Sequence, residues 1–427
     1  MTWHEDDRHR YLRRCWLKAL LAIALPGNAV AEISRRVAAR TLPTPLLLDA
    51  FSTSASAGYE SSPNTELSDY RFARSAEGNV RLVGNGRSGT MYVRKTTSSS
   101  ILPADMGVVA WMVRRNSGSY NGLQATQTQG ANTGTVTYED HPSSWRGGRR
   151  WVAGHVSEFG GFSAGAVGKV TYQISANQVA PYDADVVVGP VYQQAAGRPS
   201  VLFTFDDVRD EQINNVFPLM QARGMKATVY AVKKFTGSGS PRMSLEQLQT
   251  LNAAGWDIGT NTQADVGITT FADDATCVAD LAEAKAWLVE NGMPRAVDHM
   301  ALSNGLWSES RLAALEAAGM KTARGVTGST IYTRFGYGDI AMTLPAYTCT
   351  RQTAGTLKSH IDLAILRGSS IIFYLHDVSS APTGLGTDIT IFTELIDYVQ
   401  EKRNVGLIDV LTITDFDSIV SAARIGV

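Results

Sequence analysis

Cysteine, net charge and long apolar runs are all scarce in this chain of 427 residues. Cys15, Cys277 and Cys349 are widely spaced and form no C-x-x-C pattern, so they support neither a disulfide framework nor a thiolate zinc site. Lys and Arg total 39 against 40 for Asp and Glu, a net charge of -1, so no overall field attracts nucleic acid or an anionic membrane. A neutral ligand such as a glycan is compatible with that balance.

Residues 1–42 favour a helical segment that anchors the chain or docks on a partner. Basic residues precede the short apolar run Ala19–Leu25, which falls well short of the ~20 residues of a membrane-spanning helix. Helical patterns extend over residues 4–25 and 29–40, with a break at Pro26 and Gly27. A secretory signal cleaved after Ala31 is the alternative interpretation, and the acidic residues near the start of the chain count against it.

Residues 43–193 predict a β-sandwich of jelly-roll type. Short alternating segments are separated by turn signals rich in Gly, Ser and Asn, without helical periodicity. The predicted strands are 70–74, 80–83, 90–94, 108–113, 135–138, 151–153, 169–173 and 184–188. The order of these parts loosely resembles the carbohydrate-binding modules attached to carbohydrate enzymes. Aromatic residues in a sandwich are more commonly part of a buried core than stacked on sugar rings, so no sugar-binding site is assigned to this region.

Residues 194–427 alternate between strand and helix patterns, which predicts a distorted (β/α) barrel with its site at the carboxyl ends of the strands. The first strand, Val201–Phe205, leads directly into Asp206 and Asp207. Adjacent side chains on a strand point to opposite faces, so the two carboxylates serve different roles only if the chain turns there. Helix capping is the simplest role for such a pair when it stands alone.

Five ordered motifs in this region give the pair further meaning. They are Thr204–Asp207, Gly224–Thr228, Leu251–Gly259, Ala301–Gly305 and Phe373–Asp377. Together they resemble the polysaccharide deacetylase family, carbohydrate esterase family 4, which removes acetyl groups from glycans with a divalent metal. The resemblance implies that Asp206 is the general base, His376 the general acid and Asp207 a metal ligand. It also implies that Asn304 and Gly305 contact substrate or its oxyanion.

The chain departs from the family at several of these motifs. Asn261 and Asp265 stand where the family has two metal-binding histidines. With Asp207 they make an all-oxygen set, which favours magnesium, manganese or calcium over zinc, unless the site has lost its metal. The family's usual arginine beside the base has no counterpart in the third motif, and His299 and Arg324 are the candidates to lie near Asp206.

Two functions follow from this pattern. The first is metal-dependent hydrolysis of N- or O-linked acetyl groups on a surface polysaccharide, favoured because Asp206 and His376 are both retained. The second is a non-catalytic glycan-binding or structural protein, favoured because both histidines are replaced. The order of the three regions also resembles a bacteriophage tail component that docks to a virion through residues 1–42. A secreted or envelope-attached bacterial protein is the competing interpretation.

Overall fold

The computed structural model describes residues 199–326 and 341–422 and, between residues 46 and 195, the backbone of strands β1 to β12. The helices predicted within residues 1–42 lie outside the described residues, so the docking segment and the signal peptide both stay predictions. No helix in the described part of the chain has the length and apolar character needed to cross a membrane.

The strands between residues 46 and 195 form two antiparallel sheets. One has the order β1-β12-β6-β11-β4-β3 with β9 beside β6, and the other has the order β2-β5-β10-β7-β8. Their bounds are Leu46–Asp49, Tyr59–Ser61, Thr65–Tyr70, Asn79–Gly84, Gly89–Thr97, Met106–Arg114, Tyr120–Gln129, Asn132–Tyr138, Arg149–His155, Val170–Gln178, Asp185–Val188 and Val191–Ala195.

The antiparallel strands match the predicted β-rich region, with one poor match. The strand expected at 70–74 meets described structure only at Tyr70, where β3 ends. Long β7 (Tyr120–Gln129) was not among the predicted strands, because its Gln and Thr residues give no apolar alternation. The jelly-roll sandwich, which requires the two sheets to pack face to face, stays a prediction.

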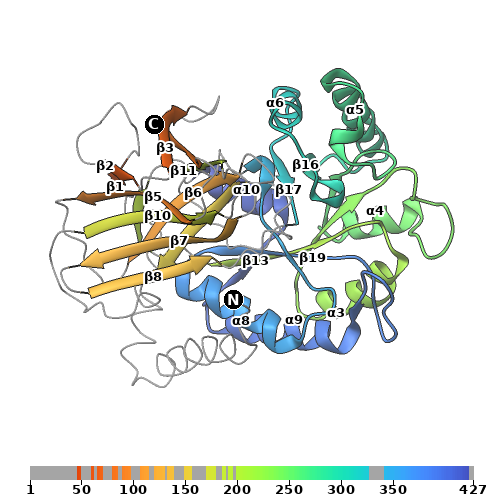
Figure 1. The fold of residues 1–427 in the computed structure, drawn as a ribbon. Helices are drawn as coiled ribbons and strands as arrows, with labels where there is room; N and C mark the ends of the chain where they lie inside the picture. The colour runs from red at the N-terminus through yellow and green to blue at the C-terminus, as the bar shows by residue number, and fades with distance from the viewer. Residues whose placement is uncertain are drawn as a thin grey trace.

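A curled parallel sheet of eight strands forms the second part of the molecule (Figure 1). Its order is β17-β16-β15-β14-β13-β19-β18, with β22 beside β13. The strands are β13 (Ser200–Phe205), β14 (Thr228–Ala231), β15 (Asp257–Thr260), β16 (Ala296–Ala301), β17 (Thr322–Arg324), β18 (Tyr347–Thr348), β19 (Ser370–Leu375) and β22 (Asp409–Val410). The path ends at β17 and β18 without a closing pair in the described part of the chain, so the predicted barrel is seen as a half-barrel.

Helices lie around the outside of this sheet (Figure 1). They are α3 (Phe217–Gln221), preceded by the π-helix Gln212–Val216, then α4 (Leu245–Ala253), α5 (Asp274–Glu290), α6 (Glu309–Ala317), α8 (Ala354–Arg367), α9 (Ile389–Asn404) and α10 (Ile413–Ala422). A capping box starts α4, with Ser244 accepting from the Gln247 backbone N–H and Gln247 accepting from the Ser244 N–H.

The alternation of side chains along the strands separates a core from an inner face. On β13, Val201, Phe203 and Phe205 belong to the main apolar cluster under the helices. The rings of Phe203 and Phe205 contact Phe392 of α9, with centroids 6.0 and 6.3 Å apart. Because successive side chains alternate, Thr204 lies on the opposite, inner face, and the next inner position after it is Asp206.

Candidate active site

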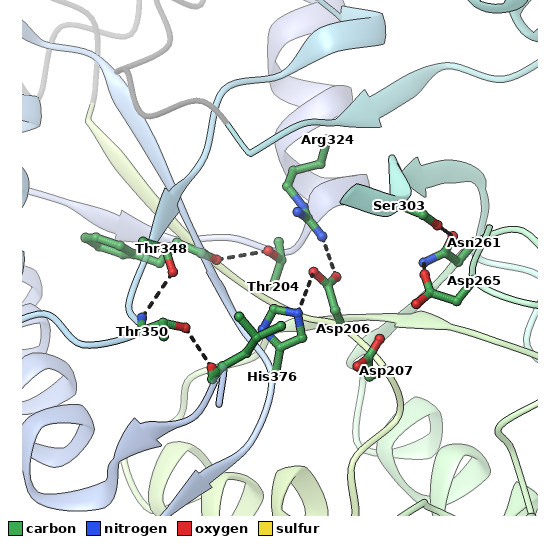
Figure 2. Close-up of polar contacts among 12 residues, drawn as sticks. Thr204, Asp206, Asp207, Asn261, Asp265, Ser303, Arg324, Thr348, Thr350 and His376 are labelled. Atoms are coloured by element: carbon green, nitrogen blue, oxygen red, sulfur yellow. Dashed lines mark hydrogen bonds and ion pairs between the residues drawn. The ribbon is translucent and has the colours of Figure 1, made fainter. Parts of the chain in front are cut away.

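The same alternation on three other strands brings polar side chains to the inner face beside Asp206. On β19, Phe373 and Leu375 face the outer core, so Tyr374 and His376 face inward. On β14, Val229 and Ala231 face outward and Tyr230 inward. Ala323 of β17 packs in an outer cluster, which turns Arg324 inward. Parallel strands place their carboxyl ends at one edge, so these residues meet there. Figure 2 shows Asp206, His376 and Arg324 together at this edge.

Asp206 and His376 face each other across the adjacent ends of β13 and β19. His376 Nε2 lies 4.0 Å from Asp206 Oδ2, and both side chains are largely buried. The buried side chain of Gln212 clamps the two strand ends, because its amide nitrogen donates to the carbonyl oxygens of Asp206 at 2.6 Å and of His376 at 2.9 Å. The acid and base suggested by the family resemblance are therefore neighbours, and their chemical roles remain proposals.

Arg324 holds the other carboxylate oxygen of Asp206. Its Nη2 donates to Asp206 Oδ1, and the arginine side chain is only 1% exposed. The guanidinium carbon lies 5.4 Å from the ring centre of Tyr230 and 5.1 Å from that of Tyr374, so two aromatic rings fix its position. An arginine beside the base, missing from the third motif, is thus supplied by β17.

His299, the other candidate neighbour of Asp206, has a different place. It is buried on β16, and its Nδ1 lies 2.9 Å from Thr322 Oγ1. Burial lowers the pKa of His299 below its ordinary value, although the carboxylates of Asp417 and Asp257 oppose that shift. No hydrogen bond or ion pair links it to Asp206 among the described contacts, and it acts as a core residue between β16 and β17.

Asp207 points away from Asp206 because the chain turns sharply after β13. Asp207 and Val208 have φ values of 67° and 47°, a left-handed conformation that is unusual for a β-branched residue such as Val208. Arg242 holds this turn: its Nη1 donates to the Asp207 carbonyl oxygen and lies 3.6 Å from Asp207 Oδ2. The guanidinium stacks over Phe235, 4.2 Å from the ring centre. The turn required for the two carboxylates to act separately is present.

Asn261 turns its amide nitrogen, rather than its oxygen, toward Asp265. Asn261 Oδ1 accepts from the Thr262 backbone N–H at 2.7 Å and from Ser303 Oγ at 2.8 Å. Its Nδ2 lies 3.5 Å from Asp265 Oδ1, as Figure 2 shows. Burial raises the pKa of Asp265, a side-chain hydrogen bond with Ser303 opposes that shift, and the negative charges of Asp207 and Asp206 add to it.

These contacts do not fit the expected metal site of Asp207, Asn261 and Asp265. The two hydrogen bonds to Asn261 Oδ1 occupy the oxygen that would bind an ion, and Arg242 already lies beside Asp207. Two like unit charges about 4 Å apart repel by about 4 kcal/mol at an effective dielectric constant of about 20, and an ion sharing Asp207 with Arg242 would meet repulsion of this kind. Within the described ranges, no group of three His, Cys, Asp or Glu side chains is arranged to hold a metal.

Asn304 and Gly305 lie in a tight turn after β16. Asn304 is exposed with a φ of 56°, and Gly305 has a φ of 64°. A Cβ atom at Gly305 would lie 2.3 Å from Val326 Cγ2, so only glycine fits. The Gly305 N–H donates to the Leu302 carbonyl at 2.8 Å. That hydrogen bond leaves the Gly305 N–H committed to the turn, and a substrate-contacting role for Asn304 stays a prediction.

Comparison with known protein families finds a match in this region. Residues 193–323 match the family model described as "Polysaccharide deacetylase". The match covers Asp206, Asp207, Asn261 and Asp265 but ends just before Arg324 and well before His376. A comparison with curated proteins found no match.

Solved structures of two deacetylases and of an acetyl xylan esterase show a loose likeness to the chain. A Streptococcus pyogenes deacetylase in complex with acetate is 16% identical, over 34% of this chain and 62% of that chain, with a TM-score of 0.31. A chitin deacetylase of the fungus Colletotrichum lindemuthianum is 13% identical, over 52% and 92%, with a TM-score of 0.35. An acetyl xylan esterase of Clostridium thermocellum in complex with a cobalt ion is 16% identical, over 52% and 96%, with a TM-score of 0.35.

Proposed function

We propose that this protein hydrolyses N- or O-linked acetyl groups on a polysaccharide. The observation that carries the proposal is the pair of Asp206 and His376, held 4.0 Å apart at the ends of adjacent strands with Arg324 fixing the carboxylate. The family match of residues 193–323 supports the reaction class.

The chemistry assigns one proton transfer to each member of the pair. Asp206 takes a proton from water as the water oxygen attacks the acetyl carbonyl carbon and forms a tetrahedral intermediate. Protonated His376 then gives its proton to the departing amine or alcohol as the C–N or C–O bond breaks, and acetic acid is the other product. Exchange of one proton from Asp206 to His376 through solvent restores the starting state. This mechanism uses no metal ion, because Asp207, Asn261 and Asp265 do not fit one.

The second candidate function is glycan binding without cleavage, and the contacts at Asp207 and Asp265 favour it. Nitrogen donors of Arg242 and Asn261 occupy the carboxylates Asp207 and Asp265, where the family resemblance implies an ion. A domain that kept the fold and bound glycan without cleaving it would show the same contacts. The two functions differ in whether Asp206 and His376 turn over substrate.

Acetate release decides between the two functions. Wild-type protein, Asp206→Asn and His376→Gln would be incubated with an O-acetylated polysaccharide and with an oligomer of N-acetylglucosamine, in EDTA and with added Mg²⁺, Mn²⁺, Ca²⁺ or Zn²⁺. We expect release by wild type and a loss of about 100-fold or more in each variant, since a positioned acid or base contributes on that order. Asp397→Asn, an exposed carboxylate on α9, is the matched control. Absence of release by wild type in every condition would favour the glycan-binding function.

The biological setting is a separate proposal that rests on resemblance alone. We propose that residues 43–193 form a glycan-binding sandwich and that residues 1–42 dock to a virion or envelope protein outside the cell. Mass spectrometry of the native protein tests the docking segment: an intact amino terminus supports it, and cleavage after Ala31 would contradict it and favour a secreted bacterial protein.

A further inference from the structure

Three carboxylates meet at this edge of the sheet, and each faces its own nitrogen donor. Arg324 donates to Asp206, Arg242 lies beside Asp207, and the Asn261 amide faces Asp265. The negative charge that a divalent ion would normally balance is therefore already balanced in part by protein groups. A guanidinium is charged at all ordinary pH values and presents several donors, so it neutralises a carboxylate permanently.

Arg242 is positioned for this purpose by more than its ion pair. Its guanidinium lies on the face of Phe235, and it also donates to the backbone carbonyl of Asp207 itself. These contacts hold the cation beside the left-handed turn at Asp207 and Val208, so the charge and the turn support each other. An exposed ion pair with free side chains would lack such fixed geometry.

The side-chain amide of Asn261 is held with its NH₂ group toward Asp265, which is the reverse of the orientation that a metal ligand needs. The Thr262 N–H can only donate, so the atom that it contacts is the amide oxygen and the other atom is the NH₂ group. Ser303 Oγ donates to the same oxygen, and the NH₂ group is left facing Asp265. A metal ligand would need to present a lone pair in that direction, as an unprotonated histidine nitrogen does.

We propose that Arg242 takes the place of a divalent cation at Asp207, and that this protein holds no metal at Asp207, Asn261 and Asp265. The inference rests on the proposed function only for the meaning of the site, because metal binding is measured without substrate. The proposal predicts that the metal site is blocked by two side chains and reappears when both are changed.

Calorimetric titration of the full chain with Zn²⁺, Mn²⁺ and Mg²⁺, after dialysis against EDTA, tests the proposal. We expect no saturable binding to wild type. The double variant Arg242→Gln, Asn261→His should bind one equivalent of Zn²⁺, with a dissociation constant at least about tenfold below any apparent value for wild type. The variant removes the competing cation and offers an imidazole between two carboxylates. Arg223→Gln, Asn404→His makes the same exchanges at a surface ion pair and an exposed helix end, and should bind like wild type.

The outcomes separate this inference from the function. Wild type that binds one equivalent of any of the three ions as tightly as the double variant would overturn the inference, and so would a folded double variant with no gain. Circular dichroism establishes folding, and Asn261→His alone serves as a second variant if the double variant unfolds, with a smaller gain expected and no gain overturning the proposal. Failure to release acetate bears on the proposed function and leaves these binding results intact.

Discussion

Removing Arg324 should destabilise the half-barrel more than removing an arginine from an exposed ion pair would. The arginine side chain is 1% exposed and its partner Asp206 is 12% exposed, so Arg324→Met leaves a nearly buried carboxylate without its cation. Breaking one side of a buried pair in this way costs about 3–5 kcal/mol. Asp206→Asn leaves the guanidinium between Tyr230 and Tyr374 without its anion, and a loss of similar order follows.

The double variant separates the pair from the rest of the packing. When both charges are removed, neither is left unpaired. The loss in free energy of unfolding for Arg324→Met with Asp206→Asn should therefore be smaller than the sum of the two single losses, by at least about 2 kcal/mol. The control is the surface pair of Arg223 and Asp397, whose side chains are 19% and 57% exposed and whose charged atoms lie 2.6 Å apart. It should show a coupling below about 1 kcal/mol.

Native-state hydrogen exchange of the β13 and β19 amides gives these free energies for the half-barrel itself in the full chain. The two single variants, the double variant and the corresponding control set would be compared with wild type under identical conditions. If the changes at Arg324 and Asp206 add to within about 0.5 kcal/mol, the two side chains are not coupled, and the reasoning from their burial is refuted.

Three other substitutions test separate parts of the structure. Burial lowers the pKa of His299, so as pH falls below about 6.5 the unfolded chain binds the proton first and the folded state loses stability. His299→Gln should therefore reduce the fall in melting temperature over this pH range, and an unchanged profile would contradict the argument. Gly259→Ala should lose about 1–3 kcal/mol in denaturant titrations, since the new Cβ would lie 2.7 Å from Tyr230 Cδ1, whereas Gly355→Ala meets nothing closer than 3.8 Å and should be tolerated. Gln212→Leu should cost about 1–3 kcal/mol and slow acetate release, because two carbonyls at the strand ends lose their donor; wild-type values in both assays would argue against the clamp.

Local patterns were enough to predict the strand that carries Asp206. The predicted strand Val201–Phe205 differs from β13 (Ser200–Phe205) by one residue at its start. Buried apolar strands and capping residues leave their signals within a few positions of sequence. Alternation of strands with helices then implies that the strands run parallel and that the site lies at their carboxyl ends.

Contacts between distant segments could not be predicted in the same way. Arg324 and His299 were both candidate neighbours of Asp206, but no local pattern could choose between them, because Arg324 is 118 positions from Asp206 and comes from β17, which has only three residues. Arg242 lies in a loop whose path no local pattern specifies. At Asn261 the residue type was known, but its oxygen and its nitrogen are equally available until Thr262 and Ser303 show which atom they contact.

The contacts divide the site into two halves with different dependence on a cation. Asp206 has its own guanidinium from Arg324 and its own neighbour in His376, so the half of the site proposed to transfer protons is held without help from the loop residues. Asp207 is held by Arg242, which comes from another loop and contacts no atom of Asp206 among the described interactions. Because the two halves share no donor, changing Arg242 and Asn261 together should create a metal site while leaving the geometry of Asp206 and His376 in place.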